Sequence, residues 1–210
     1  MTATLTRELA SRAFAMTMGV DVTSSIIVTD ALDVPEVALW VSIDPTEIRR
    51  RRAFDLGAID DALLISLMHA LPLDRPVPLG DLEPRTLYRV NENLLPPGVA
   101  EVTATHITRV LRPVLRLHGV VVVDDDWDRG LTDASRFANQ CARMLVLTAP
   151  ACDPIAQLEA DEYSIGLVGV NETGDMSVLV APRQPGEDFT AFEWDQWELV
   201  YGSSELLTPT

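Results

Sequence analysis

Short runs of β-branched and aliphatic residues, each bounded by turn-forming residues, constrain the fold of this chain most strongly. Runs of four to eight such residues are typical of strands. They alternate with segments whose apolar residues recur at intervals of three and four, which is the spacing of amphipathic helices. The chain is therefore expected to adopt an α+β fold of mixed helices and short strands. The strand candidates are residues 24–30, 36–44, 120–123, 163–170 and 176–183.

Helix signals follow the first two strand candidates. Asp44, Pro45 and Glu47 stand at the N-cap, first and third positions of a helix that Gly57 would end. The clearest amphipathic helix covers residues 58–72, where Pro72 forms its C-terminal limit. Another short helix is expected near the N-terminus, at residues 4–16.

The last third of the chain predicts helices around a hairpin. Two helices are expected at residues 134–147 and 153–162. The strand candidates at 163–170 and 176–183 flank Gly174 and predict a β-hairpin. Thr190 and Glu193 have the spacing of a capping box, which predicts a C-terminal helix ending at Gly202.

The distribution of prolines suggests where the chain divides. Six prolines lie between residues 72 and 97. This region is the best boundary candidate, although Thr86–Val90 within it also fits a short strand. We therefore expect an N-terminal α/β part at residues 1–72, a Pro-rich connection at 73–98 and a C-terminal α+β part at 99–210. The alternative is one compact domain.

The middle segment, residues 103–123, also fits part of a winged helix. An apolar face at helical spacing stands opposite an arginine stripe, and Gly119 with a valine run follows as a candidate wing. Pro113 and the acidic run at 124–128 weaken this interpretation, because proline interrupts helices and carboxylates repel phosphate. The alternative is an ordinary solvated helix face. The stripe consists of Arg109, Arg112 and Arg116.

Four consecutive arginines, Arg49, Arg50, Arg51 and Arg52, lie on the helix expected after Asp44. Successive helical residues turn by about 100°, so the four side chains point to nearly every side of the helix. Burying an unpaired guanidinium is costly, so at least two of them are expected to face solvent, acidic residues of this chain or an external anion. We expect a binding partner there, either an acidic protein surface or a phosphate backbone.

The net charge of −16 at pH 7 argues against general affinity for nucleic acid or anionic membranes. The charge is uneven, because twelve acidic residues and a single arginine follow position 152. All sixteen basic residues are arginine, which indicates a high-GC bacterial genome and excludes lysine-based covalent chemistry. Neither a membrane span nor a signal peptide is evident, so a cytoplasmic location is expected.

No catalytic, cofactor or metal motif is recognisable. Gly-rich phosphate loops, HExxH and GxSxG sequences are absent from the chain. His69, His106 and His118 are too scattered for a zinc site. Carboxylate clusters could in principle bind a divalent cation, but a nuclease that pairs Asp with Glu-x-Lys would need Arg183 in place of the lysine. We therefore expect no cofactor and no metal.

Three aromatic residues share a face of the expected C-terminal helix: Trp194, Trp197 and Tyr201. Packing onto the hairpin is the favoured interpretation, because large aromatic side chains are mostly buried. The alternative is an exposed anchor for a partner.

Three classes of function fit these observations. The favoured one is a non-enzymatic interaction or regulatory subunit, an adaptor of a larger bacterial assembly that docks a protein partner through charged surfaces. The second is a winged-helix DNA-binding regulator that uses the arginines. The third is a metal-assisted, nuclease-like enzyme built on the carboxylates. The sequence leaves the oligomeric state open.

Overall fold

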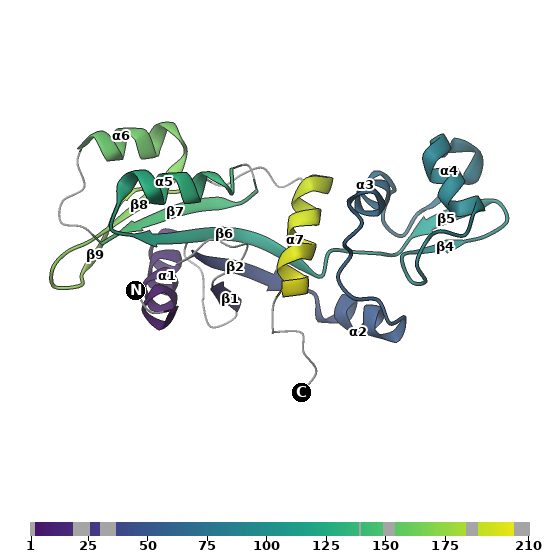
Figure 1. Cartoon of the computed structure of the whole chain (residues 1–210), viewed down its shortest axis with the longest axis horizontal. Coiled ribbons are helices and arrows are strands. Elements are labelled where there is room, and N and C mark those ends of the chain that lie inside the picture. The colour runs from purple at the N-terminus through teal and green to yellow at the C-terminus, as the bar shows by residue number, and fades with distance from the viewer. Residues whose placement is uncertain are drawn as a thin grey trace. The chain divides into compact units, whose positions relative to one another are not determined.

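The computed structural model describes residues 3–18, 26–29, 37–138, 140–148, 154–183 and 189–203. The chain divides into two compact units, each made of two segments (Figure 1). The first unit comprises Met1–Ser42 and Leu117–Glu187, and the second comprises Ile43–Arg116 and Asp188–Thr210. The second unit is therefore inserted into the first and is completed by the C-terminal segment.

The first unit is built on a mixed sheet with strand order β1-β2-β6-β7-β8-β9. β6, β7 and β8 are parallel, and the antiparallel pairs β1–β2 and β8–β9 lie at the two edges. Parallel neighbours need crossover connections, which the helices after β6 and β7 provide. The strands are β1 (Ile26–Thr29), β2 (Val37–Ile43), β6 (Leu115–Asp124), β7 (Ala142–Leu147), β8 (Ile165–Val170) and β9 (Met176–Val180).

Helices cover both faces of this sheet. α5 (Trp127–Ser135) contacts β7 and α6 (Pro154–Glu162) contacts β8, and both lie on one side of the sheet (Figure 1). α1 (Ala3–Met18) contacts β1, β7 and β9 from the other side. Strands buried on both faces read as continuous apolar runs, which accounts for the four successive valines of β6.

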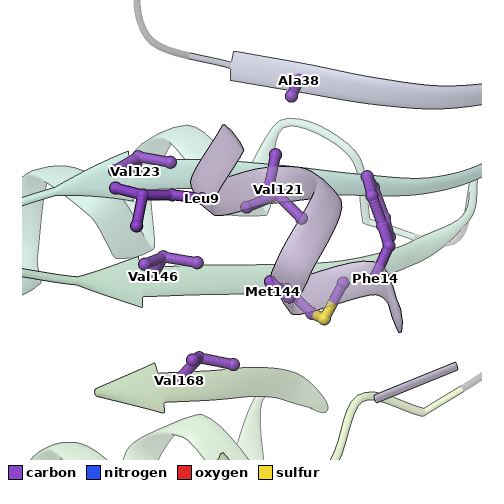
Figure 2. Close-up of a cluster of buried hydrophobic side chains, with 10 residues drawn as sticks. Leu9, Phe14, Ala38, Val121, Val123, Met144, Val146 and Val168 are labelled. Carbon is purple, nitrogen blue, oxygen red and sulfur yellow. The ribbon is translucent and has the colours of Figure 1, made fainter. Parts of the chain in front are cut away.

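The core beneath α1 follows the two-residue period of the strands (Figure 2). Val121 and Val123 of β6 belong to this core and alternate with Val120 and Val122, which are also buried. On α1, the residues that pack onto the strands are one, three or four positions apart, as on one face of a helix. The core residues are Leu9, Ala10, Ala13, Phe14, Ala38, Val121, Val123, Met144, Val146 and Val168.

The second unit combines helices with a three-stranded antiparallel sheet of order β3-β5-β4. Along the chain, two helices, a strand, a 3-10 turn and a third helix precede the last two strands, and a fourth helix comes from the C-terminal segment. The elements are α2 (Pro45–Ala53), α3 (Ala62–Ala70), β3 (Pro76–Pro78), η2 (Leu79–Asp81), α4 (Pro84–Asn91), β4 (Ala100–Val102), β5 (His106–Arg109) and α7 (Ala191–Ser203).

The core of the second unit joins α3 and α7. Trp194 of α7 is fully buried among residues of α3 and of the segments around the small sheet. α4 adds Val90 to the edge of this cluster. The central members are Ile59, Leu64, Ile65, Met68, Leu71, Val99, Ile107, Leu111 and Trp194.

The α+β fold class and several local predictions are confirmed. The Asp44 carboxylate accepts hydrogen bonds from the backbone N–H groups of Thr46 and Glu47 at 2.8 and 3.1 Å, so α2 begins as expected. Thr190 and Glu193 form a reciprocal capping box at the start of α7. The hairpin β8–β9 is present, with a positive φ at Gly174 in its turn.

Two predicted helices are wrong. Residues 106–109 and 115–118, expected on a helix, belong to strands, and burial there follows a two-residue period on both sides of Pro113. The strand expected at 120–123 is confirmed as part of β6. The helix expected at 134–147 instead begins at Trp127, and Ala142–Leu147 forms the parallel strand β7. The strand alternative for Thr86–Val90 is also wrong, since these residues belong to α4.

The observed division differs from the expected one. Residues 73–98 do not connect two domains, because they form β3, η2 and α4 inside the second unit. Prolines occupy positions that suit them there: both ends of β3 and the first position of α4.

Candidate docking surface beside α4

Exposed charged and apolar side chains lie together along α4 in the second unit. Pro84 occupies the first helical position, where its missing N–H costs nothing. Val90 faces the core of the unit, whereas Arg85 and Tyr88 are exposed on another side of the helix. Residues three apart are neighbours on a helix, so these two side chains form one continuous surface.

This surface borders a groove of about 590 Å³, which we call the α4 groove. Its volume lies in the range of sites that hold small ligands or peptide side chains. Tyr88 is 61% exposed and Leu94 is 53% exposed, so the groove offers apolar area to solvent. The residues that line it are Asp61, Pro84, Arg85, Tyr88, Arg89 and Leu94.

The charges of the groove are only partly neutralised internally. Asp61 caps α3 by accepting the Leu64 N–H at 2.9 Å, and its other oxygen accepts from Arg89 Nη1 at 2.9 Å. The hydrogen bond from the Arg89 guanidinium holds the pKa of the Asp61 carboxyl below its ordinary value, against a smaller opposing effect of burial. Arg85 makes no polar contact with any described residue, so the groove carries one uncompensated positive charge.

The four consecutive arginines have different environments. Arg51 is fully buried, Arg50 is half-buried, and Arg49 and Arg52 are exposed. Arg50 donates to Glu47 and to the Gly98 carbonyl, and Arg49 Nη2 donates to Thr46 Oγ1 at 3.2 Å. Arg51 therefore cannot contact a partner, which corrects the expectation for that residue, while the roles of the other three stay predictions.

Arg51 is the centre of a buried network. Its guanidinium donates to both carboxylate oxygens of Glu198 at 2.6 Å and to Glu47 Oε1 at 3.0 Å. It also donates to the carbonyls of Gly57 and Arg112 at 3.2 and 2.7 Å. Burial alone would lower the pKa of Arg51, but the hydrogen bonds that it donates to Glu198 and Glu47, and their negative charges, outweigh burial and raise the pKa. The network joins α2 to α7 within the second unit.

The predicted arginine stripe does not exist as such. Arg109 is buried on β5, donates to the carbonyls of Leu111 and Met68 at 2.9 Å, and lies 4.6 Å from the Trp194 ring centroid. Burial lowers the pKa of its guanidinium. Arg112, which is ion-paired with Asp74, and Arg116 are exposed. The helical spacing that aligned the three residues is replaced by strands, so Arg109 is removed from the candidate binding residues.

The three aromatic residues of α7 are buried: Trp194, Trp197 and Tyr201 are 0, 3 and 8% exposed. The exposed-anchor alternative is therefore wrong. Trp194 packs into the core of the second unit, and Phe189 lies 5.0 Å from Trp197 between ring centroids. Burial is confirmed, but Trp194 packs among residues of α3 and of the segments around the small sheet in the second unit.

The acidic clusters do not form a metal site in the described part of the chain. No group of three or more His, Cys, Asp or Glu side chains there is placed to hold a metal ion. Asp124 and Asp125 are instead ion-paired with Arg129. Arg183, the residue that would replace a catalytic lysine, pairs with Asp161 at 2.9 Å on the surface.

Sequence reasoning missed the α4 groove. Six prolines made this segment resemble a connection, although Leu87 and Val90 are spaced as on a helix face and Pro84 stands at a helix start. Arg85 and Arg89, four residues apart on that helix, were the detectable signal.

Comparisons with known proteins give no family for this chain. A scan against protein-family models and searches of curated proteins and of solved structures found no match. Among the described residues, no helix is long and apolar enough to cross a membrane.

Proposed function

We infer that the protein is a non-enzymatic docking subunit, and that the α4 groove is the surface that binds its protein partner. The observation that carries this inference is the groove itself, in which exposed Tyr88 and Leu94 stand beside Arg85 and Arg89. Aromatic residues and arginine are enriched where proteins bind one another.

The element order of residues 62–109 supports a recognition role. The order helix, strand, 3-10 turn, helix and two strands, with β5 in the middle of the sheet, resembles a winged helix in which the 3-10 turn η2 takes the place of the second helix. In that arrangement α4 takes the position of the recognition helix. Winged-helix modules bind proteins as well as DNA, so the fold does not decide between these two functions. The charge of the surface around α4 is the evidence that bears on this choice.

Charge favours a protein partner over DNA. Residues 59–112 contain seven acidic residues and five arginines, and one of these arginines, Arg109, is buried. Two of the acidic residues, Asp81 and Glu83, immediately precede α4. DNA-binding modules carry a surplus of positive charge on the contacting face, because affinity depends on neutralised phosphates. The DNA-binding alternative rests on the element order alone.

A site-specific photo-crosslinker tests the docking role. The crosslinking amino acid is placed at position 88 of the full chain, and the matched control carries it at Tyr163, which is 51% exposed in the first unit. Irradiation in lysate of the source cell is expected to give a discrete protein adduct from position 88 only, and nuclease treatment should leave it unchanged. Equal adducts from both positions, or an adduct lost with nuclease, would contradict the proposal.

A further inference from the structure

The charge and the apolar area of the α4 groove specify the chemistry of its occupant. We propose that the groove binds an acidic segment of a partner protein that carries an aromatic or branched aliphatic anchor residue. This proposal rests on the proposed docking function and adds the chemical class of the ligand.

The first argument is the sign of the local charge. The lining of the groove contains two arginines, Arg85 and Arg89, and one carboxylate, Asp61, so the groove is positive although the protein as a whole carries −16. Asp61 already forms an ion pair with Arg89 and accepts the Leu64 N–H, so much of its charge is compensated within the chain. A cationic ligand would compete with Arg89 for this carboxylate, whereas an incoming carboxylate finds Arg85 without an internal partner among the described residues.

The second argument is that ionic contacts alone would not hold a ligand. Exposed ion pairs contribute roughly 0–1 kcal/mol each, so two arginines give little affinity. Tyr88 and Leu94 supply the apolar area, and both are more than half exposed. Burying that area against an anchor residue supplies most of the binding free energy, while the arginines select the charge of the ligand.

The third argument concerns nucleic acid, which also combines negative charge with rings that stack on tyrosine. A nucleic-acid strand presents a phosphate at every nucleotide and would pass Asp81 and Glu83, which precede α4. A peptide can place carboxylates beside Arg85 and Arg89 only. The spacing of charge around the groove therefore favours an acidic peptide.

A selection from a random 12-residue peptide library tests the proposal without assuming a sequence. The library is displayed on phage and selected on the full chain at 0.15 M salt, where the Debye length of about 8 Å screens distant repulsion. Clones that also bind the Tyr88→Ser variant are removed. The retained peptides are expected to have net negative charge and at least one Trp, Phe, Leu or Ile. Retained peptides that are neutral or basic, or the absence of any enrichment over the variant, would overturn the proposal.

Charge-matched variants then place the best acidic peptide in the groove. Arg85→Glu is expected to weaken its binding at least tenfold in a fluorescence anisotropy titration. Arg75→Glu makes the same change in net charge at an exposed arginine outside the groove and is expected to change binding less than threefold. Equal weakening by the two variants would show that only the overall charge matters and would refute the ligand assignment.

Two further probes separate this proposal from its alternatives. A peptide with its anchor residues changed to serine is expected to bind at least tenfold more weakly, and the oligonucleotide dT12 more weakly still. Tighter binding of dT12 than of the selected peptide would replace the peptide proposal with single-stranded nucleic acid. A specific crosslink from position 88 combined with selection of basic peptides would leave the docking function standing and refute the acidic class.

Discussion

The buried network around Arg51 allows one perturbation to be worked out in detail. The Glu198 carboxylate accepts four hydrogen bonds, two from Arg51, one from the Ile59 N–H at 3.0 Å and one from Trp194 Nε1 at 2.9 Å. Each carboxylate oxygen accepts one bond from Arg51 and one from a neutral donor. Both partners of the ion pair are at most 2% exposed.

Glu198→Gln keeps the shape of the side chain and removes half of these bonds. The amide nitrogen of glutamine donates and does not accept, so it would face two N–H donors. Whichever oxygen it replaces, one charge-assisted bond from Arg51 and one bond from a neutral donor are lost. Such losses cost roughly 1.5–3 and 0.5–1.5 kcal/mol, so the free energy of unfolding of the second unit should fall by about 2–4.5 kcal/mol. Arg51 keeps Glu47 and two backbone carbonyls, so we expect less than the full 3–5 kcal/mol typical of an uncompensated buried charge.

Hydrogen exchange of second-unit amides measures this cost locally, without assuming that the two units unfold together. The exchange rate at Ile59 should rise about 30- to 1600-fold at unchanged pH, since each 1.4 kcal/mol is about tenfold. Arg112→Ala is the control, because its ion pair with Asp74 is exposed and its backbone groups in the network are retained. A Glu198→Gln effect no larger than that of the control would refute the claim that the network holds the second unit together.

Three further outcomes follow from the packing and charges. Gly130→Ala should lower the free energy of unfolding by about 1–3 kcal/mol, because a Cβ there would lie 2.5 Å from Leu145 Cδ1. Gly80→Ala is the control and should cost under about 1 kcal/mol, because a Cβ there would meet no atom within 4 Å. Urea titrations of the two variants measure the difference. Burial opposes ionisation of Asp124, but arginine and backbone hydrogen bonds lower its pKa overall. Its stabilising effect is therefore present above the ordinary carboxyl pKa of about 4 and lost as pH falls through the lower folded pKa, so Asp124→Asn should flatten the loss of stability below about pH 4. Tyr88→Ser should change thermal stability little, by under about 0.5 kcal/mol, because the side chain is mostly exposed.

How much of the fold the sequence predicts depends on how local the signals are. The capping residues Asp44 and Thr190 act on the N–H groups two or three positions ahead, and both helix starts were predicted correctly. Residues 107–117 were assigned wrongly because their apolar residues fit both a helical and a two-residue period. Pairing with β3 and β4, which are remote in sequence from one another, decides that β5 is a strand.

The candidate site was less predictable than the fold for the same reason. The environment of each arginine depends on residues brought close by folding: Arg51 pairs with Glu198, which lies 147 positions away. Nothing in the run of four arginines distinguishes Arg51 from Arg52. Likewise, the groove beside α4 exists because Asp61 at the start of α3 lies next to Arg89, 28 positions further along the chain.

The use of arginine at position 51 follows from the number of donors. The five N–H groups of the Arg51 guanidinium make five hydrogen bonds, to two carboxylates and two backbone carbonyls. Lysine has three donors and would leave two of these buried contacts unmade. Counting arginines therefore overstates the positive surface of this chain, because Arg51 and Arg109 hold backbone and carboxylate groups in the interior. A surface with so few available cations cannot rely on charge for its affinity, and for this reason we assign the larger share of partner binding to Tyr88 and Leu94.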